Sequence, residues 1–145
     1  MSPKDGPRAA DRYRLDEQIG FLLRQANQRH VGIFARRIPD LTPTQFAALA
    51  KLSELGAVSQ NELGRQTAMD AATIKGVIDR LSKRGLTMTG PDSKDRRRRV
   101  VELTGDGVAA FAAAAPEAFE ITAETLAPLT PTERDELLRL LRKAP

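Results

Sequence analysis

Apolar residues follow a helical spacing along most of the chain, and one segment departs from it. In residues 11–37, 42–55, 59–85 and 107–127, and again from residue 130, apolar residues recur at intervals of three and four, the period of an amphipathic helix. Residues 86–103 instead hold two short runs of strand-forming residues around a Gly-Pro-Asp-Ser turn. The pattern predicts a mainly α chain with one small β-hairpin.

Several predicted helices begin with recognisable capping residues. In a capping box, a serine or threonine and the residue three positions later exchange hydrogen bonds with each other's backbone. The pairs with this spacing are Thr42 with Gln45, Ser59 with Glu62, and Thr130 with Glu133. Asp70 is expected to cap a further helix, which Gly85 ends.

Glycine and proline set the other boundaries. Residues 1–10 have no period and are interrupted by both residue types, so we predict a disordered tail. The first helix is predicted from residue 11 and ends before Pro39. Pro116 lies inside segment 107–127, where its ring and missing N–H are expected to bend or break the helix.

Residues 59–85 predict two short helices joined by a tight turn, and the second has a clear exposed face. Its apolar residues Ile74, Val77, Ile78 and Leu81 form one buried stripe. The opposite face is small near its start and basic at its edges, which suits entry into a DNA groove. A solvated charged face is the alternative, and for this helix alone it is the simpler one. The exposed residues are Ala72, Thr73, Lys75, Gly76, Asp79, Arg80 and Lys83.

Two features of this face need separate interpretation. Ala72 and Gly76 would let the helix backbone approach a groove floor closely. Asp79 is the one acid, and we expect it to accept a hydrogen bond from Lys75 or Lys83, four positions away on either side, or from a cytosine amino group.

A basic cluster separates the two strand-like runs, Leu86–Thr89 and Arg99–Leu103. From residue 80 to residue 99, eight basic residues face two acids, a net charge of +6. Basic runs are usually solvated surface. This one lies in the hairpin directly after a pair of helices, which is the position of a DNA-binding wing. The residues between the runs that we expect at the DNA are Lys94, Asp95, Arg96, Arg97 and Arg98.

These segments resemble the MarR family of bacterial transcription regulators. Asp95-Arg96-Arg97, then Leu103-Thr104 after five residues and Gly107 after two more, is similar to the wing of that family and its exit. Thr73-Ile74, Asp79-Arg80-Leu81 and Lys83-Arg84-Gly85-Leu86 are similar to its recognition helix. The resemblance extends over roughly residues 15–143. Gly76 departs from the pattern, because a larger polar or basic residue is common there.

The resemblance implies a winged helix-turn-helix fold with dimerisation helices at both ends. The expected parts are a tail (1–10), an N-terminal dimerisation helix (11–40), a DNA-binding lobe (41–104) and C-terminal dimerisation helices (105–145). The apolar faces of the terminal helices also need more cover than one small domain supplies, which predicts a homodimer. Its two recognition helices should lie about 34 Å apart and read a pseudo-palindrome.

The resemblance also implies a function. Proteins of this kind mostly act as repressors on double-stranded DNA, and a small molecule bound between the dimerisation helices and the lobes changes the spacing of the lobes. By the same resemblance, Asp95 orients Arg97 for the minor groove. The effector class that it suggests is an aromatic carboxylate or its coenzyme A thioester.

Candidate effector contacts gather near the junction of the first two predicted helices. Adjacent arginines suit a carboxylate or a phosphate. Other interpretations remain open, because Arg36 and Arg37 also favour a helix C-terminus and His30 also suits a surface or a satisfied core position. The candidates are Asn27, His30, Arg36 and Arg37, with Phe34, Phe46 and Phe111 as apolar walls.

Composition argues against other classes. The chain has one histidine and no cysteine, and it has no glycine-rich phosphate loop or metal-ligand spacing, so we predict no catalytic residue, metal or cofactor. Glu117, Glu120 and Glu124 share a helical face and are interpreted as solvent-facing charge. No apolar run is long enough to span a membrane, and the composition fits the cytoplasm. The alternative to a DNA-binding regulator is a winged-helix module that binds protein.

Overall fold

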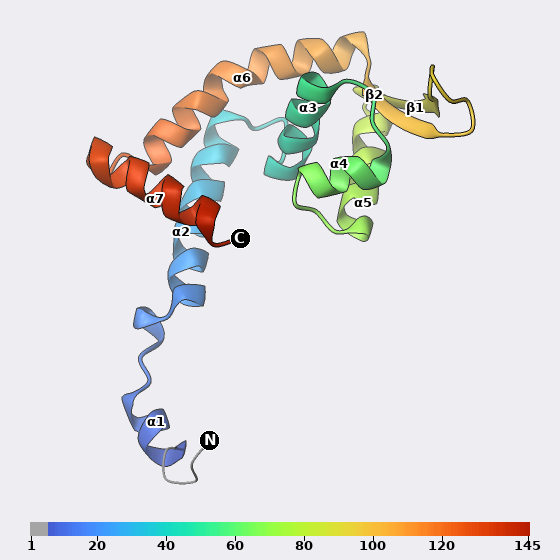
Figure 1. Cartoon of the computed structure of the whole chain (residues 1–145). Helices are drawn as coiled ribbons and strands as arrows, with labels where there is room; N and C mark the ends of the chain where they lie inside the picture. The colour runs from blue at the N-terminus through green and yellow to red at the C-terminus, as the bar shows by residue number, and fades with distance from the viewer. Residues whose placement is uncertain (1–5) are drawn as a thin grey trace.

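Helices make up most of the structure, a computed structural model that describes residues 6–145 (Figure 1). Strands β1 (Thr87–Pro91) and β2 (Arg99–Leu103) pair as an antiparallel hairpin, with Thr87 opposite Leu103 and Pro91 opposite Arg99. The mainly α prediction with one hairpin is confirmed. The helical elements are α1 (Gly6–Arg12), the 3-10 helix η1 (Leu15–Glu17), α2 (Ile19–Arg37), α3 (Pro43–Leu55), α4 (Gln60–Gln66), α5 (Ala71–Lys83), α6 (Gly105–Thr125) and α7 (Pro131–Lys143).

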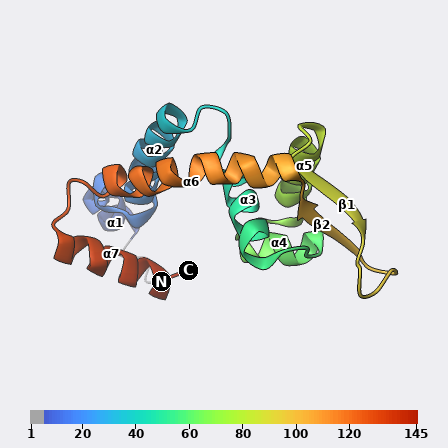
Figure 2. The same cartoon turned by 90° about the horizontal axis from the view of Figure 1, so that it is seen from above.

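The hydrophobic core is centred on the lobe formed by α3, α4, α5 and the hairpin, and it continues to buried residues of α2 and α6. The largest fully buried side chains are Leu49, Leu63, Ile74, Leu81 and Val101, contributed by all three helices and by β2. A backbone bridge between Val58 and Val101 also ties the α3–α4 connection to the hairpin. Figure 2 shows this lobe at one end of α6. Helices α2 and α7 lie toward the other end of α6.

The predicted caps are largely confirmed. Thr42 with Gln45 and Thr130 with Glu133 form complete capping boxes. The Asp70 carboxylate accepts from the Thr73 backbone N–H at 2.7 Å. At Ser59 only half of the box forms, because the carboxylate of Glu62 contacts Arg65 and Gln66 instead.

The N-terminal boundary differs from the prediction. Residues 6–10 of the predicted tail belong to α1, since proline is favoured at the first turn of a helix and the following residues are good helix formers. Residues 1–5 of the predicted tail lie outside the described residues. The helix predicted from residue 11 is interrupted, and α2 begins only at Ile19. The backbone is extended at Arg14 and Gln18, and residues 13–17 are exposed, so no packing holds the connection between α1 and α2 in one continuous α-helix.

The hairpin is longer than predicted. Gly90 and Pro91 lie in β1 and not in the turn, and the connecting loop runs from residue 92 to residue 98. Proline is tolerated here because it lies at the end of an edge strand. The wing is therefore a hairpin with a seven-residue basic loop.

Helix α6 joins the lobe to the far end of the molecule. It continues through Pro116 without a break, and Figure 1 shows its ribbon curving along its length. Of the two expected outcomes at Pro116, the break is excluded. No helix among residues 6–145 is long and apolar enough to cross a membrane.

Apolar side chains remain exposed at the end away from the lobe. On α2, Ile19, Leu22 and Leu23 are exposed, and α7 buries none of its residues although Leu140 and Leu141 lie on it. The larger side chains of the two helices therefore form an uncovered apolar surface in the single chain.

Candidate nucleic-acid interface and small-molecule cavity

Helix α5 presents the predicted surface. Ile74, Val77, Ile78 and Leu81 are buried against the lobe, and the predicted face is exposed except for Gly76, which is half-buried. Hydrogen bonds from the backbone and side chain of Thr73 to the Asp70 cap lower the pKa of that carboxyl group. The helix thus begins at a fixed point of the lobe and shows one continuous face to solvent.

The side chains on this face are arranged in local pairs. Lys75 Nζ donates to Asp79 Oδ2 at 2.9 Å, so Lys75 is the partner among the alternatives considered for that acid. The guanidinium of Arg80 folds back over Gly76, where a Cβ would lie 3.3 Å from Arg80 Nη1. The absence of a side chain at Gly76 therefore makes room for Arg80, a role that the spacing of residues did not indicate.

The wing loop is held by its two aspartates. Asp92 Oδ1 accepts from the Lys94 backbone N–H at 3.1 Å. Asp95 Oδ1 accepts from the backbone N–H of Arg97 at 3.1 Å and from its side-chain Nε at 3.3 Å. The Asp95–Arg97 contact implied by the family resemblance is present, and 93% of the Arg97 side chain remains exposed.

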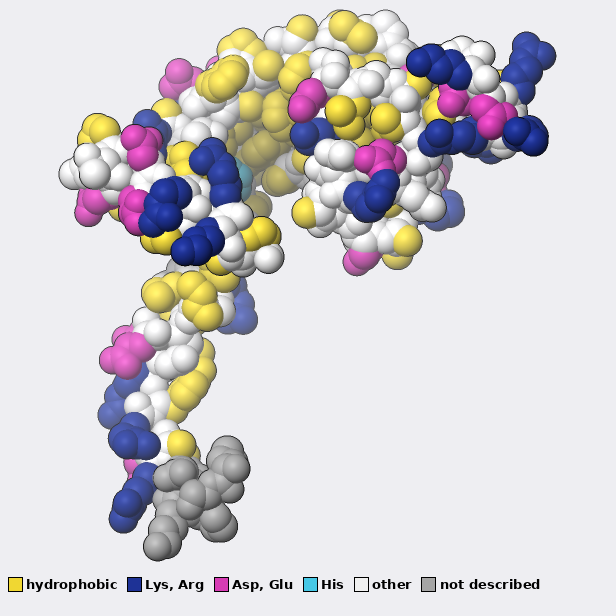
Figure 3. All heavy atoms as spheres, viewed as in Figure 1, with side chains coloured by type: hydrophobic (Ala, Val, Ile, Leu, Met, Phe, Trp, Pro, Cys, Tyr) yellow, Lys and Arg dark blue, Asp and Glu magenta, His cyan; other side chains and the backbone are white. Residues whose placement is uncertain are grey.

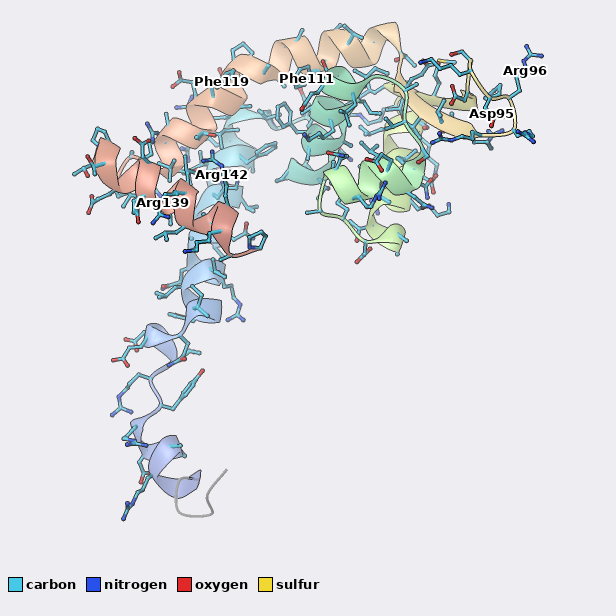
Figure 4. The ribbon with its side chains drawn as sticks, viewed as in Figure 1. Asp95, Arg96, Phe111, Phe119, Arg139 and Arg142 are labelled. Atoms are coloured by element: carbon cyan, nitrogen blue, oxygen red, sulfur yellow. The ribbon has the colours of Figure 1, made fainter. Side chains whose placement is uncertain are left out.

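The basic residues of the loop are displayed together. Lys94, Arg96, Arg97 and Arg98 are all exposed, and Figure 3 shows Lys and Arg side chains gathered over the hairpin at the end of the lobe. In Figure 4, Asp95 and Arg96 lie at the outer part of the wing. This projecting positive loop beside an exposed helix is the arrangement that suits binding to a polyanion.

Part of the predicted effector site lines a cavity of about 240 Å³ between α2, α3 and α6, which we call the His30 cavity. Phe34 and Phe46 lie in its wall, with ring centroids 6.1 Å apart, and His30 Nδ1 is 3.0 Å from Thr125 Oγ1. Phe111 stacks behind Phe46 at 5.6 Å. The lining residues are His30, Phe34, Pro43, Phe46, Ala118, Ile121 and Thr122.

The other polar candidates lie elsewhere. Arg36 and Arg37 both contact the carboxylate of Glu124, and Arg37 also reaches Glu117 Oε2 at 3.2 Å. These contacts correct the interpretation of Glu117 and Glu124 as solvent-facing charge. Asn27 is exposed and, like the two arginines, is not part of the lining of the His30 cavity.

The ion pairs between α2 and α6 form a clasp centred on Glu124. Arg37 Nε donates to Glu124 Oε2 at 2.7 Å, and Arg29 Nη2 donates to the Glu124 backbone carbonyl at 2.7 Å. The hydrogen bond from Arg37 lowers the pKa of Glu124, and the same bond raises the pKa of Arg37. The adjacent arginines thus pair with carboxylates of the same chain.

Sequence reasoning missed the α6 side of the cavity. Ile121 and Thr122 line it, and Thr125 contacts His30. The helical period of 107–127 indicated that one face is covered, but it did not indicate which helix covers it. A hydroxyl pair three positions apart on that face was the available signal.

Comparisons with known proteins agree with this geometry. The sequence profile of the MarR family matches residues 41–98. The chain is 42% identical to the HTH-type transcriptional repressor NicR of Pseudomonas putida, over 98% of this chain and 91% of NicR.

Two solved structures are similar along most of the chain. A probable transcriptional regulator from Pseudomonas aeruginosa is 53% identical, with a TM-score of 0.86 over 90% of this chain and 98% of that one. BpsR of Bordetella bronchiseptica, whose DNA binding is regulated by 6-hydroxynicotinic acid, is 45% identical, with a TM-score of 0.86 over 90% of this chain and 95% of BpsR. With the profile match in the lobe and the likeness to NicR over nearly the whole length, the chain belongs to the MarR family of DNA-binding transcription regulators.

Proposed function

We propose that this protein is a transcriptional repressor that binds a pseudo-palindromic operator as a two-fold dimer and is released by a small aromatic carboxylate. The observation that carries the proposal is the exposed face of α5 beside a projecting arginine loop on one lobe. The likeness to the repressor NicR supports the direction of regulation.

In this proposal α5 enters the major groove. Thr73, Lys75 and Arg80 reach base edges or phosphates, and Lys83 neutralises phosphate. Ala72 sets the approach of the helix backbone. Because Arg80 covers Gly76 in the free protein, we expect Arg80 to swing outward on DNA and open that turn of the helix.

The wing reaches the adjacent minor groove. A planar arginine fits a narrow groove of high negative potential, and Asp95 holds Arg97 in position for it. Lys94, Arg96 and Arg98 contact phosphates in this proposal. Such contacts give affinity without sequence preference, so the preference for one operator is assigned to α5.

Dimerisation is assigned to the two ends of the chain. The exposed apolar side chains of α2 and α7 supply the surface, and a second copy of the chain is the proposed cover. This assignment keeps the predicted division into residues 11–40, 41–104 and 105–145, with α1 added as an N-terminal extension of the first part.

The His30 cavity is the proposed effector site. Phe34 and Phe46 offer apolar contacts for an aromatic ring, and His30 and Thr122 offer polar groups for a carboxylate. The volume of about 240 Å³ suits a one-ring acid and is too small to enclose a coenzyme A group. We therefore favour the free acid over the thioester, in keeping with the ligand of BpsR.

The position of this cavity offers a route for release. Its walls come from α3 in the lobe and from α2 and α6 at the dimerisation end, so a ligand contacts both parts. The two conformations differ in the spacing of the lobes, and only one of them binds DNA. A ligand that prefers the other conformation by a few kcal/mol is sufficient to release the protein from the operator.

Fluorescence anisotropy with DNA flanking the protein's own gene tests the proposal. Affinity should fall about a thousandfold between about 50 and 200 mM salt for some six phosphate contacts. Among 6-hydroxynicotinate, benzoates, hydroxycinnamates and the coenzyme A thioesters of these acids, at least one free acid should release the DNA. Binding that ignores salt, or no binding at all, would favour the protein-interaction module instead.

A further inference from the structure

A second cavity, of about 290 Å³, lies where the end of α2, the α2–α3 connection, the end of α5 and helix α6 meet. We call it the Arg84 cavity. It shares no lining residue with the His30 cavity. Leu41, Leu86, Ala110 and Ala113 give it apolar walls. Its charged lining residues are Arg37, Asp40, Arg84 and Glu117.

Arg84 is the residue in this cavity that is best placed to bind an anion. Its Nη1 donates to the Asp40 backbone carbonyl at 2.7 Å and lies 3.4 Å from Gln45 Oε1, and both acceptors are uncharged. Among the described residues, no carboxylate lies within ion-pair distance of it. A guanidinium has five N–H donors and bonds more strongly to a carboxylate than to a neutral oxygen.

The second arginine of the cavity is not available in the same way. Arg37 is held by Glu124 and Glu117, so its charge is already matched. Glu117, with 47% of its side chain exposed, keeps acceptor capacity beyond its one contact with Arg37. The cavity thus combines apolar walls, a carboxylate that can accept a hydrogen bond, and a guanidinium that has no ion-pair partner among the described residues.

We propose that the Arg84 cavity is a second small-molecule site, which takes a one-ring carboxylic acid bearing a hydroxyl group. The carboxylate binds Arg84, the ring packs on Ala110 and Ala113, and the hydroxyl donates to Glu117. The site does not depend on a ligand in the His30 cavity.

Occupancy would act on DNA binding through the end of the recognition helix. Arg84 is the C-terminal cap of α5, and its contacts tie α5 to the α2–α3 connection and to buried Gln45 in the first turn of α3. A carboxylate competes with Asp40 and Gln45 for the guanidinium. The ligand therefore loosens the support of α5 and lowers the affinity for DNA.

The test measures binding of 3-hydroxybenzoate to the full-length protein without DNA, by calorimetry and by the side-chain Nε–H NMR signal of Arg84. Ala113→Leu fills the cavity without touching a charge, and Arg84→Met removes the anion partner. Ala109→Leu is the matched control, because Ala109 is exposed one turn earlier on α6 and lines neither cavity. Thr122→Leu fills the His30 cavity.

We expect a binding event that shifts the Arg84 signal, persists in Ala109→Leu and Thr122→Leu, and weakens by about tenfold or more in Ala113→Leu and Arg84→Met. Benzoate, which lacks the hydroxyl, should bind there more weakly. If Ala113→Leu, folded by circular dichroism, binds 3-hydroxybenzoate like the parent and the Arg84 signal does not move, the inference is overturned.

The same variants separate this inference from the proposed effector site. Binding lost only in Thr122→Leu supports the His30 cavity and overturns the Arg84 cavity. Binding lost only in Ala113→Leu and Arg84→Met has the reverse meaning.

Discussion

At the scale of single residues, Asp95 gives the sharpest test of how the wing works. Its carboxylate holds both the backbone and the side chain of Arg97. Asp95→Ala removes a negative charge beside the DNA, which on charge alone should strengthen binding. If the carboxylate serves to orient Arg97, we expect the opposite, a loss of affinity for every sequence alike.

Anisotropy titrations of three variants check this expectation. Arg97→Gln should lower the affinity for DNA by about tenfold or more. It should also lower the slope of log affinity against log salt concentration, the salt slope, by about 1. Asp95→Ala should follow in the same direction. Glu102→Ala, which removes an exposed acid from β2, is the control and should bind as well as the parent or slightly better. Tighter binding by Asp95→Ala would show that Asp95 has no orienting role.

Gly107 marks a close approach between α6 and Leu86, the residue before β1. A Cβ added there would lie 2.0 Å from the Leu86 carbonyl oxygen, a backbone atom that cannot turn away. We expect Gly107→Ala to lower the free energy of unfolding by about 1–3 kcal/mol, measured by urea denaturation at fixed protein concentration. The control is Gly105→Ala on the same helix, where an added Cβ meets nothing within 4 Å and stability should hold.

Which residue roles the sequence could predict depended on separation along the chain. The pairs Lys75–Asp79 and Asp95–Arg97 lie within four positions of each other, so helical geometry or the family motif was sufficient. The partner of Arg37 is 87 positions away, and nothing local indicated it. The acids of α6 were therefore assigned to solvent, and the arginines of α2 to an effector.

At the scale of elements, the pairing of α2 with α6 should depend on pH through Glu124. Arg37 lowers the pKa of this carboxyl group in the folded state. A lowered folded-state pKa stabilises the protein fully above the unfolded-state pKa, and this contribution disappears as the pH falls through the folded-state pKa. Asp70, Glu133 and Glu136 also have lowered pKa values, so the parent alone cannot isolate the effect.

Thermal melts of Glu124→Gln and of the parent protein, compared across pH, isolate the contribution of Glu124. The variant should melt at a lower temperature at neutral pH, and the gap should close only in acid below the ordinary pKa of glutamate. Glu120→Gln, on an exposed position of the same helix, should melt like the parent throughout. A gap that stays constant into strong acid would mean that the clasp does not act through ionised Glu124.

Element boundaries were predictable where local chemistry fixes them. The starts of α3 and α7 follow from Thr42 and Thr130, whose capping boxes involve only neighbouring residues. The start of α2 was missed, because the apolar period continues through residues 11–18, although no packing holds residues 13–18 in an α-helix. Periodicity reports which face would be buried, but not whether a partner is present to bury it.

At the scale of the whole molecule, the exposed leucines of α7 indicate that a single chain does not bury all of its apolar surface. An exposed apolar face on two helices is costly in water, and a second copy removes that cost for both chains at once. We expect a solution mass of about twice 15.9 kDa by light scattering. Leu140→Glu places a charge in the proposed interface and should shift the mass toward a single chain. Leu55→Glu, at a similarly exposed position on α3, should leave the dimer intact.

The affinity for operator DNA should depend on whether the protein is a dimer. A single lobe has one α5 and one wing, so it loses the second half-site and the phosphate contacts that come with it. Leu140→Glu should therefore bind operator much more weakly, with a salt slope about half that of the dimer, because the slope scales with the number of phosphates neutralised. Leu55→Glu should keep the full slope. If Leu140→Glu remains dimeric with unchanged slope, the interface lies elsewhere on the chain. If it is monomeric yet binds like the parent, one lobe carries the recognition, and the pseudo-palindrome loses its physical reason.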